Sequence, residues 1–124
     1  MEELHDRVVR EIVNSLNRTN FDVYINPGQE KNAGISGNYP DVIMTTKDTT
    51  TVKFIMEVEV AETVTQNEAT RQWKKYADEI NATMYLVVPE ASLQKAKDLC
   101  QRNGINCRYV TFKLSNGSLS FNFQ

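Results

Sequence analysis

Two carboxylates in an otherwise apolar stretch are the residues of this sequence with the clearest chemical potential. The segment Phe54–Val60 reads Phe-Ile-Met-Glu-Val-Glu-Val, so Glu57 and Glu59 stand two residues apart. In a β-strand, side chains at positions i and i+2 point to the same face, roughly 6.5–7 Å apart. Glutamate is rarely buried without a partner. Two glutamates on one face of a buried strand therefore need a cation, a proton or water.

A third carboxylate belongs to the segment that we expect to pair with this strand. Asp41 opens the apolar segment 41–46, and a polar turn at 47–50 separates it from the segment 51–60. So short a connection predicts an antiparallel hairpin, which would place Asp41 across from Glu57 and Glu59. Three converging carboxylates repel one another without a cation, and their oxygen atoms suit Mg²⁺ or Mn²⁺. The alternative is that all three side chains face solvent at the strand ends.

The elements that must position these residues follow from periodicity and turn signals. Apolar residues at helical spacing indicate helices, and β-branched or aromatic segments bounded by turn residues indicate strands. The segment Met84–Val88 is apolar throughout and ends at Pro89, which is typical of a parallel strand buried on both faces. Thr65 and Glu68 have the spacing of a helix-starting capping box. We expect helices at 2–17, from 65 to about 80 and at 92–103, and strands at 21–25, 41–46, 51–60, 84–88, 107–114 and 119–123.

This order of elements predicts an α/β fold in which a mixed central β-sheet is flanked by helices on both faces. The length of 124 residues fits a single domain, 1–124. The acidic N-terminus lacks the basic region and apolar core of a signal peptide, and no apolar run reaches the length of a membrane span. We therefore expect a soluble, cytoplasmic protein. In that compartment Cys100 and Cys107 are expected to stay reduced.

Asp41, preceded by proline, and the tripeptide Glu57-Val58-Glu59 that follows after fifteen residues resemble the motif of the PD-(D/E)xK nuclease superfamily. That superfamily includes type II restriction enzymes, archaeal Holliday-junction resolvases and recombination exonucleases. The resemblance covers roughly residues 2–114, including the element order. It implies a three-layer restriction-endonuclease-like core in which Asp41, Glu57 and Glu59 bind Mg²⁺ or Mn²⁺ and hydrolyse phosphodiester bonds. The chain departs from the motif at Glu59, where the superfamily has lysine; a few restriction enzymes also have glutamate there.

Three further residues match catalytic positions of the superfamily. Gln72 and Tyr76 fit the Q-h-x-x-Y pattern that flanks the active site in exonucleases of this type. Tyr76 also belongs to the apolar stripe of its helix, so core packing is the alternative. Glu11 matches a first-helix acidic residue that contributes to the site in several members, with solvent exposure as the alternative. The sequence's one histidine, His5, falls in the apolar stripe of the first helix, which favours a core histidine with a local hydrogen bond.

Nucleic-acid contacts are expected from the basic residues beside Gln72. Arg71, Lys74 and Lys75 would contact the DNA backbone together with Tyr76 and the loop between Asn26 and Tyr39. For the two lysines the alternative is a solvated helix face. The net charge of −2 argues mildly against non-specific binding to phosphates.

These observations support a metal-dependent nuclease that acts on DNA in preference to RNA, as a homodimer or with a partner protein. A second hypothesis is a catalytically degenerate module of the same fold that binds nucleic acid or a protein without cleaving. A third is an unrelated α/β interaction domain whose two glutamates pair with basic residues inside the sheet.

Overall fold

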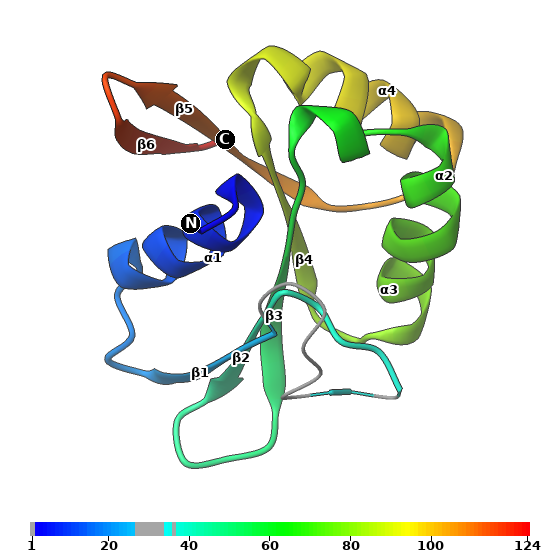
Figure 1. Cartoon of the computed structure of the whole chain (residues 1–124). Coiled ribbons are helices and arrows are strands. Elements are labelled where there is room, and N and C mark those ends of the chain that lie inside the picture. The colour runs from blue at the N-terminus through cyan, green and yellow to red at the C-terminus, as the bar shows by residue number, and fades with distance from the viewer. Residues whose placement is uncertain (1, 27–33, 36) are drawn as a thin grey trace.

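A six-stranded mixed β-sheet runs through the computed structural model, which describes residues 2–26, 34–35 and 37–124. The strands lie side by side in sequence order, and Figure 1 shows the sheet crossing the molecule between two groups of helices. The pairs β3–β4 and β4–β5 are parallel and the other three are antiparallel. The strands are β1 (Phe21–Ile25), β2 (Val42–Thr46), β3 (Val52–Val58), β4 (Thr83–Pro89), β5 (Arg108–Ser115) and β6 (Ser118–Phe123).

Helices cover both faces of the sheet, so the expected α/β class and layered arrangement are confirmed (Figure 1). On one face lies α1 (Leu4–Ser15). The other face carries α2 (Gln66–Glu68), a π-helical turn η2 (Ala69–Trp73), α3 (Lys74–Glu79) and α4 (Leu93–Arg102). Short 3₁₀ turns, η1 (Ala61–Thr63) and η3 (Glu90–Ser92), follow β3 and β4.

Strand β3, which carries Glu57 and ends just before Glu59, separates the two halves of the core. Ile55 packs with α3 and α4, whereas Met56 and Val58 pack against α1. This alternation is the one that the sequence predicted. The neighbouring strand β4 is buried on both faces, as expected for a parallel strand with helices above and below it: Leu86 and Val87 are fully buried on opposite sides.

The predicted helix after β3 exists but is not continuous. Thr65 Oγ1 accepts a hydrogen bond from Glu68 N at 3.2 Å, which confirms the N-cap. The chain then widens into the π-helical turn η2 before α3 begins. Good helix formers carry no local signal for such a turn, so the sequence pattern could not predict it. The π-helical turn matters because it carries Gln72, one of the candidate site residues.

The turns agree with the sequence signals. Gly104 ends α4 with a positive φ of 65°, and Asn116 and Gly117 turn the β5–β6 hairpin with φ of 52° and 80°. The expected loop between Asn26 and Tyr39 lies partly outside the described residues. Within its described part, Ile35 and Asn38 form an isolated antiparallel bridge. Among the described residues, no helix has the length and apolar character needed to cross a membrane.

Candidate functional site

The three predicted carboxylates come together where β2 begins and β3 ends. Val42 pairs with Met56 in the antiparallel ladder, so Asp41 lies beside Glu57. The backbone N–H of Asp41 donates to Glu57 Oε1 at 3.0 Å, and the N–H of Val58 donates to Asp41 Oδ2 at 2.8 Å. Each strand thus holds the carboxylate of the other in place. The predicted hairpin register is the cause of this proximity.

Glu59 completes this group, and its carboxylate has the least hydrogen bonding of the three. Asp41, Glu57 and Glu59 are only 7%, 4% and 3% exposed. Among the described residues, Glu59 Oε2 is buried without a hydrogen-bond partner. Burial, followed by the negative charges of Glu68 and Asp41, raises the pKa of Glu59 to about 8. A buried carboxyl with a free oxygen beside two further carboxyls has a strong electrostatic demand for a proton or a cation.

The pKa of Glu57 is raised by the same two causes, burial and neighbouring negative charge. Burial raises the pKa of its carboxyl well above the usual range, and the charges of Asp41 and Glu59 raise it further. The backbone N–H of Asp41 opposes this shift by donating to the ionised form. The mutual effects show that these carboxyls behave as one electrostatic unit, which we call the acidic cluster: Asp41, Glu57 and Glu59.

Gln72 reaches this cluster from the π-helical turn. In the amide orientation that satisfies its neighbours, its nitrogen donates to Glu57 Oε2 at 2.8 Å and to Glu68 Oε2 at 2.9 Å. The sequence prediction that Gln72 lies at the site is therefore matched by its position. Glu68 is a fourth carboxylate near the site, and sequence reasoning treated it only as a capping residue. Its spacing of four residues before Gln72 on a helix was the signal that could have found it.

His5 supplies the positive charge of the site. The predicted local hydrogen bond is present, but the predicted core position is wrong, because the ring is half-buried and bonds Asp41. Its ring lies between two carboxylates, with Nδ1 2.9 Å from Asp6 Oδ1 and Nε2 3.1 Å from Asp41 Oδ2. The bond to Asp41 is the main cause that raises the pKa of His5 to about 9, against the effect of burial. The half-buried imidazole is therefore a cation at neutral pH. Nothing in the spacing of the apolar stripe distinguishes this role from core packing.

Two other candidate site residues, Glu11 and Tyr76, are not bonded to the acidic cluster, and for Tyr76 the alternative of core packing is the one found. Glu11 accepts a 2.6 Å hydrogen bond from Arg7, and Arg7 in turn donates to Gly117 O in the β5–β6 turn. Glu11 is therefore directed towards that hairpin, and His5 is the residue of α1 that bonds to the acidic cluster. The ring of Tyr76 is 6% exposed and belongs to the core, so it does not offer a surface to nucleic acid. Its hydroxyl is still within the electrostatic influence of the cluster: burial, and then the charges of Glu57 and Asp41, raise the pKa of Tyr76.

The basic residues beside Gln72 lie on the outer side of the helical segment. Arg71 and Lys75 are exposed, and Lys74 Nζ bonds Asp78 Oδ1 at 3.2 Å. Their position agrees with the expected solvated face and leaves Arg71 and Lys75 free to meet a polyanion. Among the described residues, His5 is the only cationic side chain that bonds a carboxylate of the acidic cluster.

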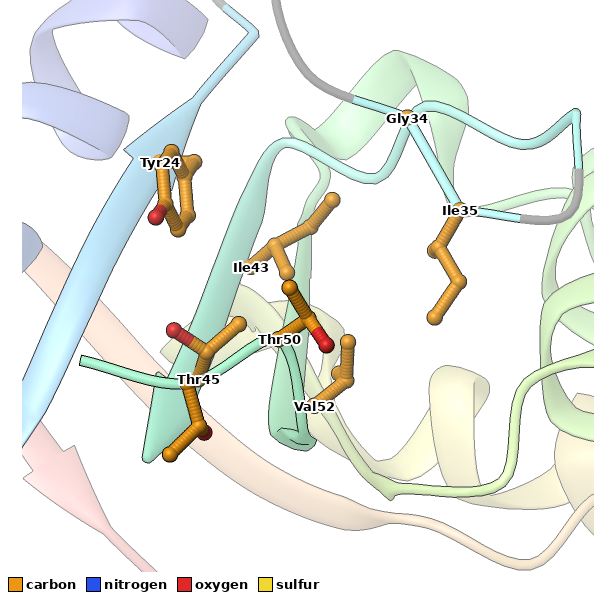
Figure 2. A pocket seen from close by; sticks show the side chains of 8 residues that line it. Tyr24, Gly34, Ile35, Ile43, Thr45, Thr50 and Val52 are labelled. Atoms are coloured by element: carbon orange, nitrogen blue, oxygen red, sulfur yellow. The ribbon is translucent and has the colours of Figure 1, made fainter. Parts of the chain in front are cut away.

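A hollow of about 300 Å³ lies farther along the same face of β2, and Figure 2 shows the side chains around it. Ile43 and Thr45 follow Asp41 at intervals of two residues, which puts them on its face of the strand, roughly 7 Å apart per step. Tyr24 on β1 stands opposite Ile43 and is 44% exposed. Thr45 Oγ1 is buried without a partner among the described residues. Aromatic, apolar and hydroxyl groups thus line the hollow, and its described lining includes no charged side chain.

The donor set of the acidic cluster fits a hard divalent cation. Its ligand atoms are all carboxylate oxygens, and one of them, Glu59 Oε2, is buried without a partner among the described residues. In the present arrangement no three acidic, histidine or cysteine side chains of the described residues are grouped closely enough to hold an ion. In this arrangement one oxygen of Asp41 accepts the N–H of Val58, and one oxygen of Glu57 accepts the N–H of Asp41. Metal binding by Asp41, Glu57 and Glu59 therefore stays a prediction.

Comparison with protein-family models, curated proteins and solved structures finds no match to this chain.

Proposed function

We propose that this chain is a cytoplasmic Mg²⁺- or Mn²⁺-dependent nuclease of the PD-(D/E)xK type that hydrolyses phosphodiester bonds in DNA. The observation that supports the proposal best is the pairing of Asp41 with Glu57 across two antiparallel strands, with Glu59 beside them in a buried site. The arrangement of α1, a three-stranded antiparallel unit, a helical segment and the parallel strand β4 agrees with the core of that superfamily.

Asp41, Glu57 and Glu59 would hold the ion, which supplies a Lewis acid that polarises the phosphodiester and activates water. The roles of the other residues follow from their contacts. The amide of Gln72 fixes the Glu57 carboxylate by its 2.8 Å bond. The imidazolium of His5 orients Asp41 and adds positive charge next to the place where a phosphate would sit. This charge partly replaces that of the lysine which the motif normally carries at the position of Glu59.

The substrate path is inferred from charge and shape. Arg71 and Lys75 are exposed on the segment that carries Gln72, where they would neutralise backbone phosphates. The hollow beside Tyr24 offers an aromatic surface for a base next to the cleaved position. A domain of 124 residues with one acidic cluster would cut two strands as a homodimer, or would take its specificity from a partner protein.

A second candidate function is the catalytically degenerate module, which binds nucleic acid or a protein partner without cleavage. The internal hydrogen bonds of Asp41 and Glu57 favour it, because they satisfy both carboxylates without an ion. The glutamate at the lysine position and the net charge of −2 agree with it as well.

A cleavage assay separates the two candidates. The protein is incubated with supercoiled plasmid, linear duplex and branched DNA in Mg²⁺, in Mn²⁺ and in chelator. The variants Asp41→Asn and Glu57→Gln keep the shape of the side chains and remove their charge, and Asp98→Asn changes an exposed carboxylate on α4 as a matched control. The nuclease predicts metal-dependent cleavage by the wild type and by Asp98→Asn only. Cleavage that persists in both cluster variants would contradict the proposal. DNA binding without cleavage in any metal would support the degenerate module.

A further inference from the structure

Cys100, near the end of α4, and Cys107, just before β5, lie side by side with their sulfur atoms 3.8 Å apart. Cys100 lies in the last turn of α4 and is 1% exposed, whereas Cys107 immediately precedes β5 and is half-buried. A disulfide bond has a sulfur–sulfur length of about 2.05 Å. The two sulfurs therefore need to approach by less than 2 Å for a bond to form.

The backbone around Cys107 is free to make this small movement. The β4–β5 ladder begins with the pair Tyr85–Arg108, so Cys107 lies outside it. The preceding turn contains Gly104 in the left-handed conformation. Its backbone bonds to α4 end with the one from Ile105 N to Cys100 O at 2.9 Å, two residues before Cys107. A shift of Cys107 would therefore leave every strand pair of the sheet intact.

Cys107 is also the thiol that a reagent can reach. It lines a surface hollow of about 300 Å³ together with Thr83, Asn106 and the exposed Arg108. The positive charge of Arg108 at this hollow attracts anionic reagents. One partner is thus accessible, and the other is buried directly behind it. This is the arrangement of an attacking and a resolving cysteine.

We propose that Cys100 and Cys107 are a reversible thiol-oxidation site that reacts with small anionic disulfides. The Cys107 thiolate attacks one sulfur of the reagent RSSR; the S–S bond of the reagent breaks, RS⁻ leaves and a mixed disulfide forms. The Cys100 thiolate then attacks the Cys107 sulfur and expels the second RS⁻. The protein loses two electrons and two protons, and the reagent gains them as two RSH. The site does not depend on the proposed nuclease function.

The contact with Cys100, together with burial, raises the pKa of the Cys107 thiol, so the pair loses its first proton from Cys100. The hydrogen bond with Cys107 lowers the pKa of the Cys100 thiol to about 7. The pair therefore carries one negative charge at slightly alkaline pH. Attack by the accessible Cys107 therefore requires its proton to pass to Cys100 across the 3.8 Å contact, which leaves the thiolate where the reagent arrives. The RS⁻ released in the first step then takes the proton from Cys100, which leaves the Cys100 thiolate for the second step.

Oxidised glutathione, without oxygen or metal, is the probe that tests this site on the whole chain at pH 8. Wild-type protein is expected to lose two hydrogen atoms in mass, stay monomeric on a non-reducing gel and recover both thiols in dithiothreitol. Peptide mapping of partly oxidised wild type should show the glutathionyl adduct on Cys107 and not on Cys100. Two free thiols after prolonged exposure, or a covalent dimer as the main product, would overturn the proposal.

Single-cysteine variants test the order of the steps. Cys100→Ser should stop at the mixed disulfide on Cys107, and Cys107→Ser should react at least tenfold more slowly, because Cys100 is buried. Circular dichroism first establishes that both variants are folded. Equal reaction rates of the two folded variants would contradict the assigned roles. If a variant does not fold, the peptide map of the wild type still decides which thiol reacts first.

Discussion

Nε2 of His5 lies 3.1 Å from Oδ2 of Asp41, and this contact ties the first helix to the acidic cluster between β2 and β3. The same carboxylate oxygen accepts the backbone N–H of Val58 at 2.8 Å. Asp41 is thereby held from two elements at once, α1 and the end of β3. The contact places a cationic side chain against the acidic cluster. The titration of His5 can test it.

The pKa of His5 should be measurable without ambiguity, since the sequence has no other histidine. Its bond with Asp41 raises the pKa to about 9. In a proton NMR titration, the midpoint of the change in the imidazole chemical shifts should therefore lie well above pH 7. Asp41→Asn should bring the midpoint down by about two units, towards the ordinary value near 6.5. Asp98→Asn should leave it unchanged. A wild-type midpoint near 6.5 would refute the contact.

The acidic cluster should make the metal-free protein less stable as the pH rises. The pKa of Glu59 is raised from 4.5 to about 8, so its contribution is fully present below pH 4.5 and is lost as the pH rises through 8. The raised pKa of His5 acts in the same direction between pH 6.5 and 9. We expect Tm in chelator to fall by about 10 °C or more between pH 6 and pH 9. A Tm that rises over this range would contradict the assigned shifts.

Glu59→Gln should stabilise the metal-free protein and impair its function. The amide keeps the volume of the side chain and removes a charge that is buried without full hydrogen bonding. We expect the free energy of unfolding at pH 8 to increase by about 1 kcal/mol, measured by urea denaturation. Cleavage, if the chain is a nuclease, should fall by at least tenfold. The same substitution at Glu62, which is exposed, serves as the control and should change neither quantity.

The local pattern of the sequence was sufficient to find the acidic cluster. Glu57 and Glu59 were predicted to share a face because the strand period is two, and the short turn after β2 fixed the neighbour, Asp41. Strand positions agree within two residues for the same reason. These features depend on residues close in the chain, and each was visible in the alternation of apolar and polar side chains.

The contacts that the sequence did not reveal depend on how distant elements cross. His5 and Asp41 are 36 residues apart, and their proximity depends on where α1 lies across the sheet. The π-helical turn that carries Gln72 towards Glu57 likewise has no local code. Tyr76 shows a further limit, because a residue that packs in the core and borders the cluster has the sequence pattern of a core residue alone.

Gln72 should influence the cluster without supporting the fold. Its amide donates to Glu57 and Glu68, and its side chain is half-buried at the surface of the π-helical turn. Gln72→Leu removes both donors and leaves two carboxylates to repel each other, so cleavage or metal affinity should fall by about tenfold. Gln66→Leu, at an exposed position of α2, is the matched control. Equal loss in both variants would show a general effect on the helix instead.

Divalent metal should stabilise the protein through the acidic cluster. An ion that binds only the folded state adds about 2.7 kcal/mol at a hundredfold excess over Kd. For a domain of this size we expect a rise in Tm of roughly 10 °C in Mg²⁺ or Mn²⁺ at pH 8. Asp41→Asn and Glu57→Gln should abolish this rise, and Asp98→Asn should retain it. An equal rise in all four proteins would place the ion elsewhere.

From the hollow beside Tyr24 we predict that the protein binds single-stranded DNA through an unpaired base. Tyr24 is 44% exposed next to Ile43 and Thr45, on the sheet face that leads to Asp41. A ring in this position can stack on an unpaired base, and such stacking contributes about 1–3 kcal/mol per base. Tyr24→Ala should therefore weaken binding of single-stranded DNA by about tenfold or more, measured by fluorescence anisotropy with Glu57→Gln as the background. Tyr24→Trp should retain binding, and Leu114→Ala controls for the loss of an exposed apolar side chain elsewhere. If duplex binding falls as much as single-strand binding, Tyr24 contacts the backbone and the hollow does not take a base.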